Sequence, residues 1–270
     1  MTRFFVYLCS ALIVLTMLPH AAHAAEGTWA SATQSRARLL TGVREGTHLQ
    51  AALEIELTPS WHTYWKVPGD AGLPPELDWS KTPLVQTALI HWPAPTRLSE
   101  AGIVTFGHTD RLFLPLDITL TDAAAPLSNL DLNLQIMVCH DICLPEKFTL
   151  AAPVDNDTTT QKRIDLARQK LPASEHPRLA VDTVVASDNA LAISVQSRDG
   201  FDGVDVIASA GDRVFTLTPN IALMASDITK AMVTLEKPAD IKNLNEFLAG
   251  KTLEVLVTRG GESVLKTTKF

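Results

Sequence analysis

Apolar and polar residues alternate with a period of two over long stretches of this chain. In residues 130–138 every even-numbered residue is apolar, and in residues 144–150 the even positions are apolar again except for Glu146. Such alternation is typical of half-buried β-strands, whose even-numbered residues here face a core. The two stretches therefore predict a β-hairpin with residues 140–142 as its turn. In the predicted register Val138 opposes Leu144 and Leu134 opposes Phe148.

The same pattern predicts strands elsewhere in the first half of the chain. Residues 48–57 and 111–120 each hold one apolar face. Pro115, in the second of these, implies a sheet edge or a bulge, because proline cannot donate a hydrogen bond to a ladder. Repeated short strands separated by Pro, Gly and Asp turns indicate an antiparallel β-sandwich.

The pattern changes at residues 154–177, which we interpret as a linker. Residues 161–171 within it carry apolar residues at helical spacing and are followed by Pro172, so they predict one short helix. Alternation then resumes, and we expect further strands at residues 191–195, 204–207, 214–217, 232–235 and 253–257. Residues 238–249 could form a helix closed by Gly250.

The whole pattern predicts an all-β protein of two domains. The first domain is expected at residues 25–153. The second, at residues 178–270, is expected to be a smaller β-sandwich. It contains no Cys, Trp or Tyr, so we expect it to be structural or to bind a partner.

Residues 1–24 have the pattern of a secretory signal peptide. Arg3 supplies a positive start, residues 4–18 form an apolar run, and Ala22-His23-Ala24 fits the small-x-small cleavage pattern. The run is short for a membrane span and no later segment approaches one, so we expect a soluble, exported mature protein. Without Arg3 the formal net charge falls from −7 to about −8, which argues against binding to nucleic acid or anionic lipid.

Two cysteines, Cys139 and Cys143, remain after such cleavage, because Cys9 lies in the signal peptide. In the predicted hairpin they face each other at a distance that a disulfide can bridge. Both are odd-numbered, so both are expected on the polar face at the mouth of the hairpin. We therefore expect an accessible disulfide rather than one deep in a core.

This disulfide could be a structural staple or a working redox pair. A closed loop of five residues contributes only about 2 kcal/mol by the loop-entropy formula. A chain of this length can bury a core without so local a staple. An accessible sulfur also favours exchange, since a thiolate must reach the sulfur that it attacks. These arguments favour a redox role.

Other chemistries remain open at the same residues. Cys139, His140 and Cys143, with Met137 beside them, could bind cuprous copper, although their spacing on a hairpin suits one metal poorly. As an imidazolium, His140 could lower the pKa of a thiol, an effect that Asp141 would oppose. A non-catalytic interaction module, in the manner of a pilus chaperone, would keep the disulfide permanently closed. The sequence has no haem-attachment motif and no Gly-rich phosphate loop, so we expect no cofactor.

Several motifs, taken in order, resemble a known family. They are Trp-His-Thr-Tyr-Trp at 61–65, Pro-Gly-Asp-Ala-Gly at 68–72, His-Trp-Pro-Ala-Pro at 91–95, Thr-Phe-Gly at 105–107 and Cys-x3-Cys-Leu-Pro-Glu at 139–146. Together they resemble the N-terminal periplasmic domain of the thiol-disulfide interchange protein DsbD. They resemble its relative ScsB, which is linked to copper tolerance, more closely still. The resemblance covers residues 30–150.

The resemblance implies an immunoglobulin-like antiparallel β-sandwich that passes electrons to periplasmic oxidoreductases. Cys143, followed after one residue by Pro145, matches the cysteine that attacks the partner. Cys139 then matches the resolving cysteine. The segment 102–110 matches a loop whose aromatic residue covers the disulfide in this family, which makes Phe106 the candidate lid, with Thr105 as the alternative.

The chain departs from DsbD in two ways. Its cysteine spacing is shorter, and it lacks the membrane domain and the thioredoxin-like domain that reload such a module. We therefore expect a diffusible periplasmic shuttle that is reduced by a separate membrane thiol reductase. Its expected clients are thioredoxin-like or disulfide isomerase proteins of the periplasm.

Overall fold

The computed structural model describes residues 26–270 of the chain. The predicted signal peptide, residues 1–24, lies outside the described residues. Within residues 26–270, no helix is long and apolar enough to cross a membrane.

The part of the chain up to Pro153 folds into two antiparallel sheets that enclose one core. The first sheet has the order β1-β2-β3-β9-β6 and consists of β1 (Ala30–Ser31), β2 (Ser35–Glu45), β3 (His48–Leu57), β9 (Arg111–Leu120) and β6 (Val85–Ile90). The second has the order β11-β10-β4-β8-β7, with β5 paired to β10. It consists of β11 (Cys143–Pro153), β10 (Asn129–Cys139), β4 (His62–Gly69), β8 (Ile103–Thr109), β7 (Thr96–Glu100) and β5 (Glu76–Asp78).

The core between these sheets is built from the alternating apolar residues that the sequence pattern singled out. The even-numbered residues of β9 and β10 are buried, and so are Phe148 and Leu150 of β11. Glu146 is the polar exception on β11, and it is buried too. Its carboxylate accepts hydrogen bonds from the backbone N–H of Gln34, at 2.6 Å, and from the Ser35 hydroxyl. Because the buried carboxylate is satisfied, the strand keeps its register through a charged residue.

Pro115 lies neither on an edge strand nor at a bulge, but it does stand at a local edge of its sheet. β9 lies inside its sheet, between β3 and β6, and the register shift of β6 falls elsewhere, between Val85 and Thr87. Pairing of β6 with β9 ends at Ile90 opposite Leu116. Pro115 therefore stands where β6 has already ended, and its missing N–H costs no bond in that ladder.

Residues 179–270 form a second, smaller sandwich of two four-stranded antiparallel sheets around Phe215, which is fully buried. One sheet consists of β12 (Leu179–Ala186), β13 (Ala190–Ser197), β17 (Asp227–Glu236) and β16 (Asn220–Met224), and the other of β15 (Arg213–Val214), β14 (Asp205–Ala210), β18 (Thr252–Arg259) and β19 (Glu262–Lys269). The prediction of an all-β fold with a second sandwich is confirmed. The strand expected at 214–217 is shorter than predicted, since β15 ends at Val214.

Two helices differ in extent from their predictions. α1 (Thr158–Arg168) begins earlier than the predicted 161–171, because Asp157 accepts hydrogen bonds from the backbone N–H groups of the first turn and so caps the helix. α2 (Leu244–Leu248) is shorter than the predicted 238–249 and begins after the cap residue Asn243. α1 also packs against the first sheet, with Ile164 fully buried against Leu40 and Ala52. The predicted linker helix is thus docked on the first sandwich.

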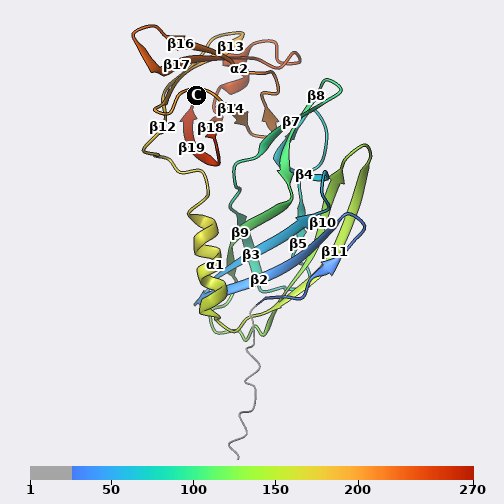
Figure 1. Ribbon diagram of the computed structural model, residues 1–270. Helices are drawn as coiled ribbons and strands as arrows, with labels where there is room; N and C mark the ends of the chain where they lie inside the picture. The colour runs from blue at the N-terminus through green and yellow to red at the C-terminus, as the bar shows by residue number, and fades with distance from the viewer. Residues whose placement is uncertain (1–25) are drawn as a thin grey trace, which may run out of the picture.

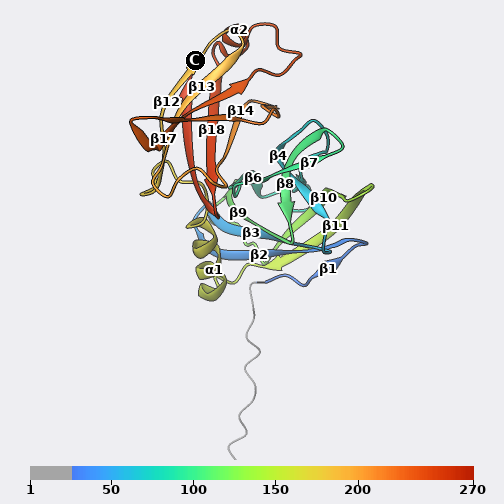
Figure 2. The same ribbon diagram turned by 45° about the horizontal axis from the view of Figure 1, so that its top comes forward.

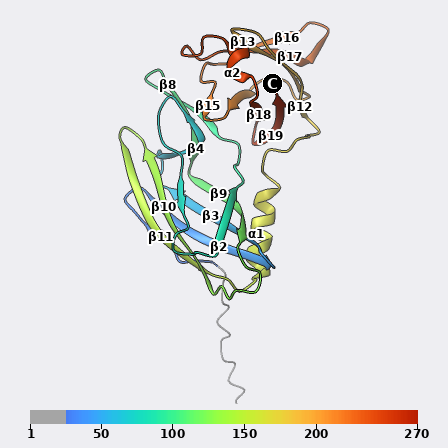
Figure 3. The same cartoon turned by 180° about the vertical axis from the view of Figure 1, so that it is seen from behind.

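The second sandwich sits at one end of the first, as Figure 1 and the tilted view of Figure 2 show. α1 lies alongside β2, β3 and β9, and the chain then rises to β12. The hairpin formed by β7 and β8 extends from the first sandwich toward the second. In Figures 1 and 3 its tip lies near the turn between β10 and β11. The domain boundaries themselves stay a prediction.

Candidate functional site

Cys139 and Cys143 form a disulfide at the end of the β10–β11 hairpin. Cys139 is the last residue of β10 and Cys143 the first of β11, and the two are directly opposed, with Cα atoms 4.1 Å apart. Every pair of the predicted register is present, including Val138 opposite Leu144. The turn is closed by the backbone N–H of His140, which donates to the Ile142 carbonyl at 3.1 Å.

The two sulfurs of this disulfide lie in different surroundings. Cys143 is exposed, as its odd position predicted, but Cys139 is only 2% exposed. The expectation that both cysteines are accessible is therefore wrong for Cys139. The reason is a third strand: β4 pairs with the last two residues of β10 and places His62 opposite Cys139. Parity along one hairpin cannot reveal a neighbour supplied by a distant segment.

Tyr64 on β4 covers the buried sulfur. Its hydroxyl donates a hydrogen bond to Cys139 Sγ at 3.0 Å and lies 3.7 Å from Cys143 Sγ. Burial raises the pKa of Tyr64, and the carboxylate of Glu100 raises it further. The phenol therefore stays protonated at neutral pH and remains a donor to whatever species the sulfur becomes.

The loop after β4 holds the Tyr64 ring in place. Gly72 has a φ of +94°, and a Cβ on this residue would lie 2.2 Å from a carbon of the ring. Such a contact is far inside van der Waals distance, so only glycine allows the loop to approach so closely. This gives a physical reason for the Pro-Gly-Asp-Ala-Gly motif beside the aromatic strand.

A small cavity of about 130 Å³ opens over the disulfide. Besides the two cysteines and His140, it is lined by His62, Tyr64, Ala71, Glu100, Ile103 and Thr105. These residues come from β4, from the loop that follows it and from the β7–β8 hairpin. Burial lowers the pKa of His62, against an opposing effect of Glu100 and together with a smaller lowering by His140. Neutral imidazole, a phenol and one carboxylate thus surround the sulfur pair.

The β7–β8 hairpin is the element that lies over the cavity. Glu100 pairs with Ile103 across a two-residue turn in which Ala101 and Gly102 both have positive φ, at 50° and 83°. Positive φ at both central residues is the pattern of a type I′ turn, whose twist matches that of the flanking strands. The segment over the disulfide is therefore a regular hairpin.

Phe106 does not lie over the disulfide. Ile103 and Thr105 of β8 line the cavity, and because side chains alternate along a strand, Phe106 points to the opposite face. There it is fully buried against Trp65 and Val67. The candidate lid is thus corrected: Thr105, which the resemblance left as the alternative, is the residue at the cavity.

The other predicted accessory residues stay near the disulfide at its surface. His140 is exposed, with its Nδ1 3.1 Å from Asp141 Oδ2 and its ring 6.1 Å from that of Trp61. Pro145 is exposed on β11, opposite Met137. His62 and Tyr64 lie in the Trp-His-Thr-Tyr-Trp motif, but no role was predicted for either residue. Residues 62–65 are all buried, so alternation of apolar and polar residues singles out neither of them.

Among residues 26–270, no group of three or more His, Cys, Asp or Glu is arranged to hold a metal ion. Both sulfurs considered as copper ligands are joined in the disulfide of this structure.

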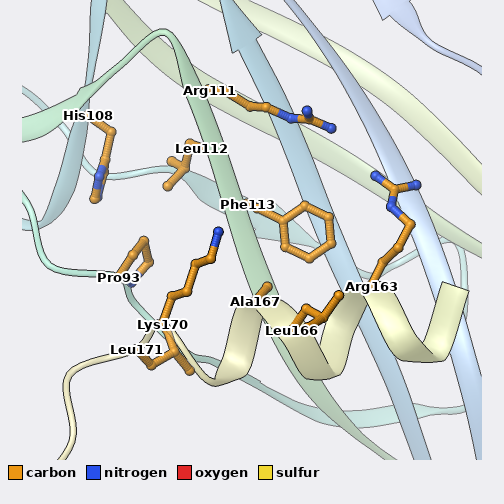
Figure 4. A pocket seen from close by; sticks show the side chains of 10 residues that line it. All are labelled: Pro93, His108, Arg111, Leu112, Phe113, Arg163, Leu166, Ala167, Lys170 and Leu171. Carbon is orange, nitrogen blue, oxygen red and sulfur yellow. The ribbon is translucent and has the colours of Figure 1, made fainter. Parts of the chain in front are cut away.

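A larger cavity, of about 430 Å³, lies between α1 and β9, away from the disulfide. Figure 4 shows Lys170 and Arg163 of the α1 segment facing Arg111 and Phe113 of β9. Arg111 and Arg163 both form ion pairs with the buried carboxylate of Glu54. The residues that line this cavity are apolar or basic and include no cysteine and no carboxylate, so the disulfide cavity is the better candidate site.

Comparison with known proteins gives a family match over the segment that contains the disulfide. Residues 33–154 match the family described as "Thiol:disulfide interchange protein DsbD, N-terminal". The crystal structure of the N-terminal periplasmic domain of ScsB from Proteus mirabilis is similar, with a TM-score of 0.69 and 21% identity over 91% of this chain and 99% of that chain. The CupB2 chaperone of Pseudomonas aeruginosa aligns over 82% of this chain and 92% of its own, at 12% identity, but a TM-score of 0.21 carries no argument. No curated protein matches the sequence.

Proposed function

We propose that this chain is a periplasmic thiol-disulfide interchange protein, because residues 33–154 match the family of DsbD N-terminal domains. The observation that supports this most directly is the unequal exposure of the two sulfurs. Cys143 is exposed and Cys139 is 2% exposed, so an approaching protein can reach only one of them. A pair of this kind is suited to an exchange reaction with one attacking and one resolving cysteine.

In this proposal the reduced protein donates two electrons to an oxidised partner. The Cys143 thiolate attacks one sulfur of the partner's disulfide, and the partner's other sulfur leaves as a thiolate. The Cys139 thiolate then attacks Cys143 Sγ, which re-forms the internal disulfide and releases the partner's second sulfur. The partner gains two electrons and takes up two protons, and this chain is oxidised.

The contact from Tyr64 supports the resolving role of Cys139. A hydroxyl donor 3.0 Å from the Cys139 sulfur stabilises a thiolate there, at a position that is otherwise desolvated. Because burial keeps the phenol protonated, the donor is present whenever the disulfide opens.

The surface around Cys143 is suited to a protein partner. Two exposed apolar side chains lie beside it: Ile142 in the turn, at 62% exposure, and Ile103 at the tip of the β7–β8 hairpin, at 48%. Exposed apolar side chains gathered around a reactive group are typical of an interaction site. A thioredoxin-like or disulfide isomerase protein is the proposed client.

Trapping tests the roles of the two cysteines. A Cys139→Ala variant, mixed with an oxidised thioredoxin-like partner, should accumulate a mixed disulfide because no resolving thiol remains. Cys143→Ala should accumulate none, since its remaining sulfur is buried. Non-reducing electrophoresis separates the adducts, and the double variant is the control. Accumulation by Cys143→Ala instead would assign the roles the other way round.

The source of electrons belongs to the same proposal. We propose that a separate membrane thiol reductase reloads the chain in the periplasm. Thiol labelling of the native protein should find a reduced fraction that disappears when such reductases are deleted. A pair that stays oxidised in every background, with a reduction potential below about −300 mV rather than above about −250 mV, would favour an interaction module with a closed disulfide.

A further inference from the structure

The second sandwich holds the hairpin that lies over the disulfide. Arg97 of β7 has a side chain only 15% exposed, and its guanidinium reaches across to Asp205 of β14. Arg97 Nε lies 3.1 Å from Asp205 Oδ2, and Nη2 lies 3.1 Å from Oδ1, so the pair is bidentate. Arg97 Nη1 also donates to the Thr216 carbonyl at 2.9 Å. Such a planar, two-pronged ion pair fixes orientation as well as distance.

An apolar cluster continues this contact along β8. Phe106 is fully buried with Trp65 and Val67 of the first sandwich and with Ile207 and Leu256 of the second. The guanidinium of Arg97 lies 4.8 Å from the centre of the Phe106 ring, within cation–π range. The hairpin is thus anchored to the second sandwich by charge and by packing at once.

The first sandwich holds the same hairpin at a different place, near its tip. β7 is the edge strand of its sheet and pairs only with β8. The ladder between β4 and β8 is interrupted after Tyr64 opposite Gly107, and it resumes only at Gly69 opposite Thr105. Near the tip, the backbone N–H of Val104 donates to Asp70 Oδ2 at 2.9 Å, and the backbone N–H of Asp70 donates to the Val104 carbonyl at 3.0 Å.

The two faces of the β7–β8 hairpin therefore meet different parts of the molecule. Glu100, Ile103 and Thr105 line the disulfide cavity. Arg97 and Phe106, on the same two strands, point into the second sandwich. A shift of the hairpin at one face must move the side chains at the other, because both belong to one regular two-stranded element.

We infer that Arg97 is a positioning residue: by binding Asp205 it lets the second sandwich fix the β7–β8 hairpin over the disulfide and so limits access of attacking thiols to the Cys139–Cys143 pair. This inference rests on the proposed redox function and gives the second sandwich a part in it. It also gives Phe106 a role in shielding the disulfide, through the position of the hairpin rather than by contact.

The test measures how fast dithiothreitol reduces the disulfide in the folded, full-length protein. Arg97→Gln and Asp205→Asn should each speed reduction, by about five- to tenfold if one charge-assisted bidentate pair is lost. The double variant should react no faster than either single variant, because both remove the same contact. The matched control is Arg213→Gln, which removes an exposed ion pair with Asp240 within the second sandwich and should leave the rate unchanged.

Two further measurements separate positioning from general loosening. Amide hydrogen exchange should rise at Ile103 and Thr105 in Arg97→Gln, while the amides of β3 keep their protection. Unchanged reduction rates in both Arg97→Gln and Asp205→Asn, or equal acceleration in Arg213→Gln, would overturn the inference. Reduction by dithiothreitol needs no protein partner, so this outcome is independent of the trapping experiment that tests the proposed function.

Discussion

The hydroxyl of Tyr64 donates a hydrogen bond to the buried sulfur of Cys139 at 3.0 Å. Two residues beside Tyr64 are each constrained by their surroundings. Gly72 fits where a methyl group would meet the ring, and His62 is held neutral by burial. At the scale of the residue, the chemistry of the site is set by what covers Cys139.

Replacing Tyr64 with phenylalanine tests that contact. Tyr64→Phe keeps the ring but removes the donor, so the pKa of the Cys139 thiol in the reduced protein should rise, by about one unit for a hydrogen bond to a charged sulfur. Ultraviolet absorbance of the thiolate, followed against pH in a Cys143→Ala background, measures it. An unchanged titration would mean that the hydroxyl does not stabilise the thiolate.

Gly72 and Gly102 form a matched pair for the close approach to Tyr64. Both have positive φ, but a Cβ at Gly102 would meet nothing within 4 Å. Gly102→Ala should therefore cost only the strain of its backbone, about 1 kcal/mol, whereas Gly72→Ala should cost clearly more. Urea unfolding measures both. Equal losses would show that the loop can move away from the ring.

His108, on the wall of the larger cavity, makes stability depend on pH. Burial lowers its pKa from the ordinary 6.5 to about 4, and its Nε2 has no hydrogen-bond partner among the described residues. Since the unfolded chain binds the proton more readily, this contribution to stability is complete above pH 6.5 and is lost as the pH falls toward 4. The loss is on the order of 3 kcal/mol.

The check is urea unfolding between pH 7 and pH 4 for the native protein and for His108→Gln. The native protein should lose more stability than the variant over this interval. Parallel curves would mean that His108 is protonated in the folded protein as easily as in the unfolded one.

At the scale of the element, alternation proved to be a reliable guide wherever one face of a strand is buried. It gave the bounds of β3 and β9 and the full register of the β10–β11 hairpin. Alternation does not predict burial where a strand from a distant segment covers the residue. Cys139 is buried by β4, which pairs with β10 from more than seventy positions away. The lid role of Phe106 was implied by the resemblance and not by alternation, and alternation along β8 is what turns Phe106 away from the disulfide.

α1 is the element whose role differs most from the prediction, because it is docked on the first sandwich and not a free linker. Ile164 is fully buried, whereas Leu166, two residues on, is 59% exposed. Ile164→Ala should therefore lower the free energy of unfolding by about 2–4 kcal/mol through loss of packing. Leu166→Ala, the control, should change it by less than about 0.5 kcal/mol. Equal small effects would restore the linker interpretation.

At the scale of the molecule, two sandwiches share a small apolar cluster and two ion pairs, Arg97 with Asp205 and Lys66 with Glu254. Nothing in the sequence pattern predicts these pairs. Their members are more than a hundred residues apart, and a charged residue on a strand face has the same local signature whether it meets water or another domain. The pattern of apolar and polar residues therefore does not predict contacts between the two sandwiches.

The disulfide itself should matter little to the stability of the whole. It closes a loop of five residues, so reduction should lower the free energy of unfolding by only about 2 kcal/mol. Urea unfolding with and without a reductant measures the difference, and the double variant Cys139→Ala/Cys143→Ala should not respond to the reductant. Collapse of the fold on reduction would identify the bond as a structural staple.

The distance between the opposed Cα atoms at the disulfide also bears on whether β11, the edge strand, can pair with another chain. Opposed Cα atoms 4.1 Å apart belong to a pair without mutual backbone hydrogen bonds, and such pairs recur at every second residue. Pro145, two residues beyond Cys143, therefore turns its ring nitrogen outward, on a strand that pairs only with β10. The outer edge of β11 therefore lacks a backbone hydrogen-bond donor at Pro145, so another extended chain cannot pair with it in register. The edge of the sheet beside the disulfide is thereby protected against pairing with the same strand of a second copy of the chain.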